Sequence, residues 1–389
     1  MKKILYLHAG SEMYGADKVL LELIKGLDKS EFEPHVILPN DGILVEELKN
    51  IGVKVAVLDY PILRRKYFNP KGILEYIKNY AKFSKVLLTY VKKEEINLIH
   101  NNTTAVLEGI YLKNKAKIPL IWHVHEIIVR PKFITDFINF LLGCYATKII
   151  TVSEAVAKHI KKSKFVSEDK VNIIYNGVDN RVYYPYSDKE KLELKKENNI
   201  SSDSLVVGMI GRVNSWKGQN DFLDATVPLL EENPNLVLML VGGVFEGEEW
   251  RMRELKERIS QLPCSERIII KDFQKSTTKL YNLYDIFILP STNPDPLPTV
   301  VLEAMACGKP ILAYRHGGVC EMVEEDKNGL LSEPNIPKGL TNNISYLLQN
   351  KEKREEFGKH SIQRQRDYFS LESYISNFSN LYRDLLSDK

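Results

Sequence analysis

Residues 289–321 read LPSTNPDPLPTVVLEAMACGKPILAYRHGGVCE, and this stretch predicts how the chain folds. An apolar strand at 286–289 runs into a proline-rich loop, and a short helix is expected from about 299 to 307. Gly308 then ends that helix, because glycine adopts the left-handed cap conformation most readily. A second β-rich run follows at 310–313. A strand, a helix and another strand in this order are typical of a βαβ unit with parallel strands.

The same rhythm extends in both directions along the chain. Short β-rich runs alternate with longer amphipathic runs such as 18–27 and 72–91. This alternation predicts parallel sheets that are covered by helices on both faces. The β-rich runs before residue 180 are 4–7, 35–38, 53–58, 98–100, 120–124, 149–152 and 171–174. Those after residue 204 are 205–210, 236–241, 267–270, 286–289 and 310–313.

A polar, charged stretch at 180–204 interrupts the alternation, and we interpret it as a linker followed by an early helix of a second domain. We therefore expect an α/β protein with two doubly wound, Rossmann-like domains, residues 1–184 and 185–370, facing each other across a cleft. Ligands of open parallel sheets bind beyond the carboxyl ends of the strands. Residues 371–389 contain an amphipathic helix pattern, which packs either on the second domain alone or back on the first domain.

Composition and charge exclude several classes of protein. The chain is 44% hydrophobic and 27% charged, as in soluble globular proteins, and no apolar run is long enough to predict a transmembrane helix. A net charge of +3 is too small to indicate nucleic-acid binding. The four cysteines form no CxxC pair, and a strand begins directly at residue 2 with no signal peptide before it. We therefore expect a cytoplasmic protein.

Two carboxylates, Asp295 and Glu303, accompany the N-terminus of the helix expected at 299–307. The unpaired backbone N–H groups at such a helix end favour a phosphate. Carboxylates in turn accept hydrogen bonds from hydroxyl groups. The combination suits a nucleotide-sugar.

Two cations follow the strand at 205–210, in the sequence GRVNSWKG of residues 211–218. Arg212 and Lys217 stand between a strand and a helix, where a diphosphate would approach. Arginine binds phosphate through two parallel N–H bonds, and lysine supplies a compact charge. The alternative is a pair of solvated surface cations, which the motif downstream disfavours.

Together these motifs resemble the donor site of the retaining GT-B glycosyltransferases of family 4, also called glycosyltransferase group 1. The family pattern is a Glu, seven residues and a second Glu, and this chain has Asp295 in the first position and Glu303 in the second. The resemblance covers nearly the whole chain and is most specific in 205–321. It implies a GT-B fold, sugar transfer with retention, and a last helix in residues 371–389 that packs back toward the first domain.

The resemblance also implies roles for the candidate residues. Arg212 and Lys217 would neutralise the leaving diphosphate, Glu303 would bind the ribose hydroxyls, and Asp295 would contact the donor sugar. Asp295 is one methylene shorter than the usual Glu. The alternative interpretation of Asp295 is a loop residue that forms a turn beside prolines. The alternative for Glu303 is an exposed position on the helix surface.

Backbone groups complete the expected donor site. Family members usually carry Gly where Pro298 stands, and proline has no N–H to offer a ligand. We expect Pro298 instead to preset the start of the helix. The amides expected to contact the donor are those of Leu297, Thr299 and Val300. The turns expected on the donor side contain Gly211 and Gly243.

Loops of the first domain are expected to face the acceptor. In the loop at 8–18 the family usually has two adjacent glycines and then Ala-Glu, where this chain has Tyr14, Gly15, Ala16 and Asp17. Gly15 still allows close backbone approach, and Tyr14 would line the acceptor pocket. His125 matches a family histidine that would hydrogen-bond the transferred sugar. The alternative for His125 is a strand-end histidine bonded to backbone.

Neither a cofactor nor a metal ion is expected. The sequence has no Asp-x-Asp pair and no His/Cys cluster at ligand spacing. Arg212 and Lys217 would take the place of a divalent cation at the diphosphate. The expected partners are therefore a nucleotide-sugar donor, with UDP preferred, and a glycan or lipid-linked acceptor. A capsule, cell-wall glycan or lipopolysaccharide is the expected product.

The segment 64–93 carries nine basic residues and a single acid, Glu75. It is either a solvated helix face or a surface that docks on anionic lipid at the inner face of the cell membrane. The apolar run at 133–142 is a further candidate for membrane contact, although burial explains it equally well.

Three other classes of protein share features with this sequence. A Rossmann dehydrogenase is rejected because no GxGxxG follows the first strand with an acid about twenty residues later. A GT-B sugar-nucleotide epimerase would share the fold, but the pattern of cations and carboxylates fits a transferase better. A non-catalytic GT-B partner subunit of another glycosyltransferase remains open because of Asp295 and Tyr14. The presence of Arg212, Lys217 and Glu303 argues against it.

Overall fold

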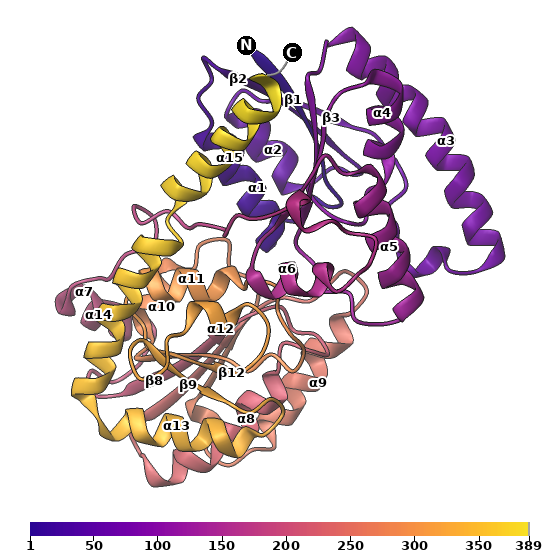
Figure 1. Cartoon of the computed structure of the whole chain (residues 1–389). Helices are drawn as coiled ribbons and strands as arrows, with labels where there is room; N and C mark the ends of the chain where they lie inside the picture. The colour runs from indigo at the N-terminus through magenta and orange to yellow at the C-terminus, as the bar shows by residue number, and fades with distance from the viewer. Residues whose placement is uncertain (388–389) are drawn as a thin grey trace. The chain divides into compact units, whose positions relative to one another are not determined.

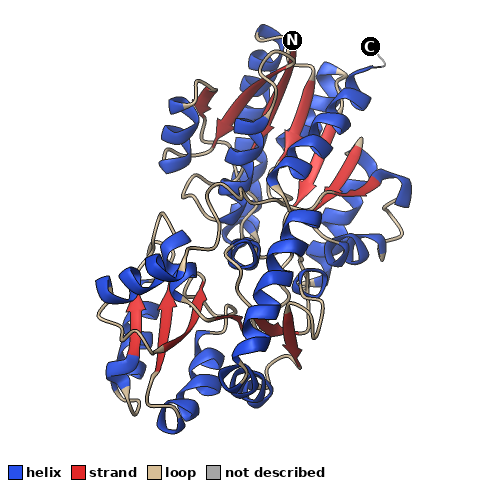
Figure 2. Cartoon of the chain, turned by 90° about the vertical axis from the view of Figure 1, so that its left-hand side faces the viewer, coloured by secondary structure: helices blue, strands red, loops and turns tan. Residues whose placement is uncertain are grey.

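The computed structural model describes residues 1–387. The chain forms two compact units, one comprising residues 1–176 with the chain from residue 371 onward and the other Gly177–Ser370. Figure 2 shows in each unit a sheet with helices on both faces. Within the described residues, no helix is both long and apolar enough to cross a lipid bilayer.

The first unit is built on a seven-stranded parallel sheet with the order β3-β2-β1-β4-β5-β6-β7. This order places β1 (Lys2–Leu7) beside both β2 (Phe32–Leu38) and β4 (Leu98–Asn101). The remaining strands are β3 (Lys54–Val57), β5 (Leu120–Val124), β6 (Lys148–Thr151) and β7 (Val171–Ile173). Its helices before residue 177 are α1 (Gly15–Gly26), α2 (Ile43–Asn50), α3 (Pro70–Lys93), α4 (Glu108–Ala116), α5 (Lys132–Tyr145) and α6 (Glu154–Lys161).

The second unit is built on a six-stranded parallel sheet with the order β10-β9-β8-β11-β12-β13. Its strands are β8 (Leu205–Ile210), β9 (Leu236–Val241), β10 (Ile268–Lys271), β11 (Ile286–Leu289), β12 (Ile311–Tyr314) and β13 (Gly329–Ser332). Its helices are α7 (Asp188–Glu197), α8 (Gln219–Glu232), α9 (Glu249–Ser260), α10 (Thr278–Leu283), α11 (Thr299–Ala306), α12 (Val319–Met322), α13 (Pro337–Gln349) and α14 (Lys351–Tyr368). Both sheets are the doubly wound α/β type that the alternating sequence pattern predicts.

The boundary between the units lies at Asn176–Gly177 and not after residue 184. Hydrogen bonds explain the difference, because the segment from 177 onward is held by α10. The side chain of Asn282 donates to the Tyr184 carbonyl (3.0 Å) and accepts from the Tyr186 amide (2.8 Å). The Thr278 hydroxyl donates to the Val182 carbonyl (3.0 Å).

The last helix, α15 (Leu371–Ser387), belongs to the first unit. Figure 1 shows α15, in yellow, beside α1, in indigo. Tyr382 is fully buried, and its hydroxyl lies 3.0 Å from that of Tyr6 and 2.8 Å from Nδ1 of His100. Arg383 pairs with Glu31 at 2.7 Å on the outer side of the helix. Its apolar face consists of Leu371, Tyr374, Phe378, Tyr382 and Leu386.

Candidate functional site

Lys217 and Asp295, two of the residues predicted for the donor site, lie in direct contact in the second unit. Nζ of Lys217 is 2.7 Å from Oδ1 of Asp295. The two residues follow β8 and β11, which are neighbouring parallel strands, so their loops leave the same edge of the sheet. Asp295 is 8% exposed, and its second oxygen, Oδ2, has no hydrogen-bond partner within residues 1–387. A buried acceptor of this kind requires a donor, and a ligand hydroxyl group fits that need.

The loop that carries Lys217 is shaped by an Asx turn and a required glycine. Oδ1 of Asn214 accepts the amides of Trp216 (3.0 Å) and Lys217 (2.9 Å), which closes the turn. Gly218 has φ = 79°, and a Cβ there would lie 1.8 Å from the Pro290 carbonyl oxygen. Only glycine fits this position, and its packing brings the Lys217 loop against the chain that leaves β11.

Arg212 lies over an aromatic ring where β8 ends. Its guanidinium carbon is 3.5 Å from the ring centroid of Phe245, a cation–π contact that orients the side chain. The amide of Val213 donates to the Gly243 carbonyl (2.8 Å), which joins the turns after β8 and β9. A Cβ on Gly242 would lie 1.9 Å from the Gly211 carbonyl oxygen. The two expected donor-side glycines therefore lie in turns that pack against each other.

Glu303 lies inside α11 and is 3% exposed, so the alternative of a helix-surface position is wrong. Its Oε2 accepts hydrogen bonds from the hydroxyls of Tyr281 (2.8 Å) and Thr277 (3.1 Å). Burial and the nearby Glu303 charge raise the pKa of Tyr281 well above its usual value, so the phenol remains a hydrogen-bond donor. Two fixed donors thus hold the carboxylate in one orientation.

The N-terminal end of α11 begins at Thr299, and Pro298 stands one residue before it with φ = −71°. The amides of Thr299 and Val300 belong to the first helical turn, where backbone N–H groups have no intrahelical acceptor. Leu297, two residues before Thr299, is buried. The expected donor-binding residues on this loop therefore lie together at one helix end, whose partial positive charge favours an anion.

Two glycines fix the backbone of the Asp295 loop. The amide of Gly318 donates to the Asp295 carbonyl (2.8 Å). A Cβ on Gly317 would lie 2.4 Å from the same oxygen, and one on Gly318 would lie 2.0 Å from the Pro296 carbonyl oxygen. The glycine pair therefore allows the chain after β12 to pack directly on the loop that carries Asp295.

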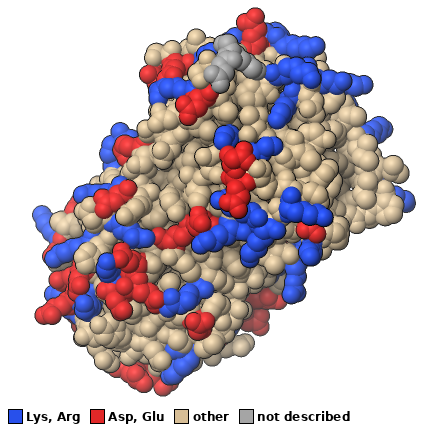
Figure 3. Space-filling model, viewed as in Figure 1, with Lys and Arg blue, Asp and Glu red and all other residues tan. Residues whose placement is uncertain are grey.

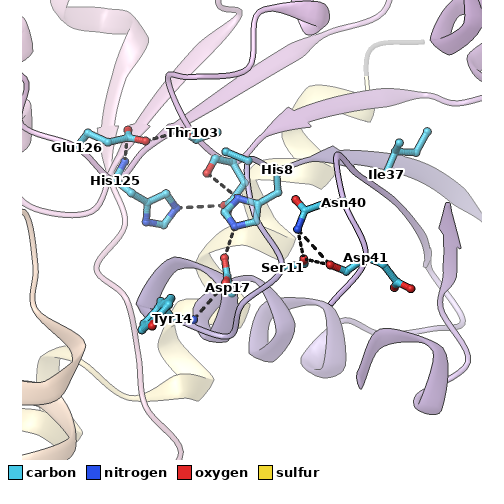
Figure 4. A network of polar contacts seen from close by, with 12 residues as sticks. His8, Ser11, Tyr14, Asp17, Ile37, Asn40, Asp41, Thr103, His125 and Glu126 are labelled. Carbon is cyan, nitrogen blue, oxygen red and sulfur yellow. Dashed lines mark hydrogen bonds and ion pairs between the residues drawn. The ribbon is translucent and has the colours of Figure 1, made fainter. Parts of the chain in front are cut away.

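The acceptor-side candidates of the first unit lie in a hydrogen-bonded chain (Figure 4). Nε2 of His125 lies 3.1 Å from Oδ1 of Asn102, and Nδ2 of Asn102 lies 3.1 Å from Nδ1 of His8. Nε2 of His8 lies 2.6 Å from Oδ1 of Asp17. Because Oδ1 of Asn102 accepts hydrogen bonds, Nε2 of His125 donates to it and carries the proton of that ring. Nδ1 of His8 faces both the side-chain nitrogen and the carbonyl oxygen of Asn102, at 3.1 and 3.3 Å. The alternative of a His125 bonded to backbone is wrong, since its partner is a side chain.

Tyr14 and Gly15 form the start of α1, Tyr14 as the N-cap and Gly15 as the first helical residue. The Tyr14 amide donates to Oδ2 of Asp17 (3.1 Å). Asp17 therefore joins the helix start to His8, and through it to His125. Figure 4 shows the two histidines and Asp17 converging from separate segments of the first unit.

Both halves of the chain match known protein families. Residues 190–364 match the family described as Glycosyl transferases group 1, and residues 13–181 match Glycosyltransferase Family 4. The chain is a group 1, family 4 glycosyltransferase.

Similar proteins support the assignment of this chain to the glycosyltransferase family. N,N'-diacetylbacillosaminyl-diphospho-undecaprenol alpha-1,3-N-acetylgalactosaminyltransferase of Campylobacter jejuni is 27% identical over 371 residues, 92% of each chain. Spore coat protein SA of Bacillus subtilis is 28% identical over 60% of this chain and 64% of its own length. Anabaena HepE, solved with UDP and glucose, superimposes with a TM-score of 0.84 at 26% identity, covering 98% of this chain and 99% of that one. The fold is accordingly GT-B.

Burial sets the protonation of the acceptor-side residues in this glycosyltransferase. Burial lowers the pKa of His125 to about 3, so the ring is neutral near pH 7. With its proton on Nε2, the His125 ring presents Nδ1 as an acceptor. Burial raises the pKa of the neighbouring Glu126, whose carboxylate accepts the amides of His125 (3.2 Å) and Thr104 (3.4 Å).

Two residues of the acceptor-side network, His8 and Asn102, are not among the site residues predicted from the sequence. A signal for both is present, because each is the first residue after an apolar strand, β1 or β4, and these strands are neighbours in the sheet. Thr277 and Tyr281, which hold Glu303, were also missed. They lie next to and within α10, and only the folded chain brings them to α11.

Proposed function

We propose that this glycosyltransferase moves a sugar, with retention at the anomeric carbon, from a UDP-sugar to a glycan or lipid-linked acceptor in the synthesis of a cell-surface polysaccharide. The solved complexes of Anabaena HepE with UDP and with UDP-glucose support the donor class, at 26% and 25% identity. The diphospho-undecaprenol in the name of the Campylobacter jejuni relative supports a lipid-linked acceptor.

The observation that carries the donor proposal is the contact between Lys217 and Asp295. The ammonium group of Lys217 lies 2.7 Å from one carboxylate oxygen of Asp295, while the other oxygen has no partner within residues 1–387. A donor sugar bound here would find a cation for its diphosphate and an unsatisfied acceptor for a hydroxyl group. Glu303, held by two hydroxyl donors, would take the ribose hydroxyls.

The chemistry follows from where charge develops. As the bond between the anomeric carbon and the diphosphate oxygen breaks, the sugar becomes oxocarbenium-like and the departing oxygen becomes negative. Arg212 and Lys217 stabilise that negative charge more in the transition state than in the ground state. The acceptor oxygen attacks from the same face of the sugar, and the leaving phosphate takes its proton. This route retains the anomeric configuration and needs neither an enzymic nucleophile nor a metal ion.

His125 would contribute to the same step from the first unit. Its ring is neutral, and its Nε2 is bonded to Asn102, so Nδ1 is directed to accept a hydrogen bond from a sugar hydroxyl. The contacts from Asn102 to His8 and from His8 to Asp17 hold the Asn102 side chain in place beside His125. In this proposal Asp17 positions His125 and does not itself contact the substrate.

A panel of nucleotide-sugars tested by thermal shift would examine the donor proposal. A ligand at a hundred times its dissociation constant stabilises the folded chain by about 2.7 kcal/mol, which is measurable. We expect UDP-sugars to raise the melting temperature, and Arg212→Ala and Lys217→Ala to abolish the shift. Hydrolysis of the stabilising UDP-sugar by purified protein would separate an enzyme from a non-catalytic partner subunit. The proposal would fail if no nucleotide-sugar stabilised the protein.

Chelation tests the proposed independence from metal ions. Arg212 and Lys217 both carry fixed positive charge next to the expected diphosphate position, which is the role that a divalent cation otherwise fills. We expect donor hydrolysis to continue unchanged in the presence of EDTA. Loss of hydrolysis with EDTA and recovery with Mg²⁺ or Mn²⁺ would contradict this part of the proposal.

A further inference from the structure

An apolar groove of about 710 Å³ opens at the carboxyl-end edge of the first unit's sheet. One side is the loop after β3, from Leu63 to Phe68, and the other is the segment after β5, from Glu126 to Ile138 in α5. Such a volume lies within the range of sites that hold one small molecule. The groove is therefore large enough for a ligand and lies where ligands of open parallel sheets bind.

The lining of this groove is largely apolar, whereas a glycan without a lipid would need mainly polar side chains. Phe68 is 40% exposed and Phe133 is 65% exposed, whereas Ile134 and Ile138, which also line the groove, are buried. Large exposed aromatic side chains around a concave surface mark a binding site for an apolar ligand. Figure 3 shows a mostly uncharged area on the side of the first unit that carries α4 and α5, with Lys and Arg at its edges.

Three arginines border the same groove: Arg64, Arg65 and Arg130. All three are exposed, and none has an ion-pair partner within residues 1–387. The only acidic residue in the lining is Glu126, whose carboxylate is directed to the amides of His125 and Thr104. The groove therefore combines an apolar surface with uncompensated positive charge. That combination complements an amphiphile with an anionic head, and arginine in particular favours phosphate.

Two contacts connect this groove to the acceptor-side network. Arg64 donates from Nη2 to the Ala9 carbonyl (3.3 Å), in the loop that leads to Tyr14. Glu126 lines the groove and accepts the amide of His125 at 3.2 Å. A phosphate held by the arginines would therefore lie next to the residues that the proposed function assigns to the acceptor.

We infer that this groove binds the lipid part of the acceptor, an isoprenoid or similar chain that carries a phosphate or diphosphate head. The chain lies on Phe68, Phe133 and Ile134, and the head is held by Arg64, Arg65 and Arg130. This inference rests on the proposed function, because the bound lipid is an acceptor only if the protein transfers a sugar. The groove itself is tested by binding alone.

Isothermal titration calorimetry with farnesyl diphosphate tests the groove, because this compound carries both features and is soluble. Inorganic diphosphate supplies the head alone and farnesol the chain alone. We expect farnesyl diphosphate to bind at least about tenfold more tightly than either. Equal affinity for farnesyl diphosphate and inorganic diphosphate would overturn the inference. Binding of the protein to phosphatidylglycerol vesicles without any binding of farnesyl diphosphate would also overturn it, in favour of a contact with the bilayer surface.

Matched variants locate the binding. Arg65→Glu and Phe133→Asp change exposed side chains of the groove, and each should weaken farnesyl diphosphate by about tenfold or more. Lys78→Glu and Leu74→Asp make comparable changes, a cation to an anion and an apolar side chain to an acidic one, at exposed positions of α3 outside the groove, and should leave the affinity within about twofold. Equal weakening by the control variants would show that the effect is general charge or hydrophobicity, and the groove would be rejected.

The thermal shift of the wild-type protein with UDP separates this inference from the proposed function. If farnesyl diphosphate binds in the groove and no nucleotide-sugar stabilises the protein, the groove stands and the donor proposal fails. If UDP stabilises the protein and farnesyl diphosphate does not bind, the groove alone is rejected.

Discussion

Nζ of Lys217 lies 2.7 Å from Oδ1 of Asp295, and the two residues come from loops that follow neighbouring strands. The resembled family usually has the longer Glu at this position. The shorter side chain of this protein holds one oxygen against the lysine and leaves the other, Oδ2, without a partner in the described part of the chain. The departure from the family pattern thus retains a carboxylate that is available to a donor sugar.

Removal of Lys217 should destabilise the fold as well as prevent donor binding. In Lys217→Ala the carboxylate of Asp295 remains buried without its cation, which costs about 3 kcal/mol of unfolding free energy. Urea denaturation measures this loss. The double variant Lys217→Met/Asp295→Asn should recover most of the stability, because it buries no unpaired charge, and should still show no thermal shift with UDP. An unchanged urea midpoint in Lys217→Ala would contradict the role of the pair.

Glu303 should be needed for donor affinity more than for folding. Glu303→Gln keeps the size of the side chain and one acceptor for Tyr281, but it removes the charge. We expect UDP affinity to fall by about tenfold, equivalent to about 1.4 kcal/mol, with a smaller change in melting temperature.

The matched control for Glu303 is Tyr281→Phe, which removes one donor and leaves the carboxylate charged. We expect this variant to bind UDP more tightly than Glu303→Gln. The opposite order of affinities would indicate that the Glu303 charge is not what binds the ribose.

Three histidines of the first unit should each reduce stability as the pH decreases below about 6.5, because their pKa values lie well below the usual value of a histidine. Burial lowers the pKa of His100 and of His125 to about 3, and that of His123 well below its usual value. Between pH 6.5 and 3 the unfolded chain therefore binds protons that the folded chain does not. Each histidine contributes a loss of about 1.4 kcal/mol per pH unit in this window, and no loss above it.

His123→Phe tests this slope, since neither ring nitrogen of His123 has a partner within residues 1–387 and the ring lies against Phe378. Urea denaturation from pH 7 to pH 5 should show a shallower loss of stability in this variant than in the wild type. His360→Gln, at an exposed position of the second unit, serves as the control and should follow the wild type. Parallel curves for His123→Phe and the wild type would refute the assignment.

Binding to anionic membranes should depend on salt. The segment 64–93 presents its basic residues at the surface, together with exposed apolar side chains at Ile73, Leu74 and Ile77 in α3. We expect sedimentation with phosphatidylglycerol vesicles at low salt and release at about 0.5 M salt, where the Debye length is short. Phosphatidylcholine vesicles are the control. Equal binding to both kinds of vesicle, or binding to neither, would contradict an electrostatic contact between this segment and the membrane.

Local sequence determined the alternation of strands and helices, the doubly wound α/β class and the donor motifs. Apolar runs of strand length and amphipathic runs of helix length are local signals, so they can be read without knowing what lies nearby in space. The stretch at 289–321 placed Asp295, Pro298 and Glu303 relative to the start of α11 because helix boundaries also depend on local residues.

Tertiary structure alone decided which side chains meet. The Lys217–Asp295 contact, the hydroxyl donors of Glu303 and the hydrogen bonds from His125 through Asn102 to His8 all join segments that are separate in sequence. The order of strands in each parallel sheet sets these meetings, since it brings particular loops to the same edge. The boundary at Asn176–Gly177 was likewise set by hydrogen bonds to α10, which no local pattern near residue 177 could reveal.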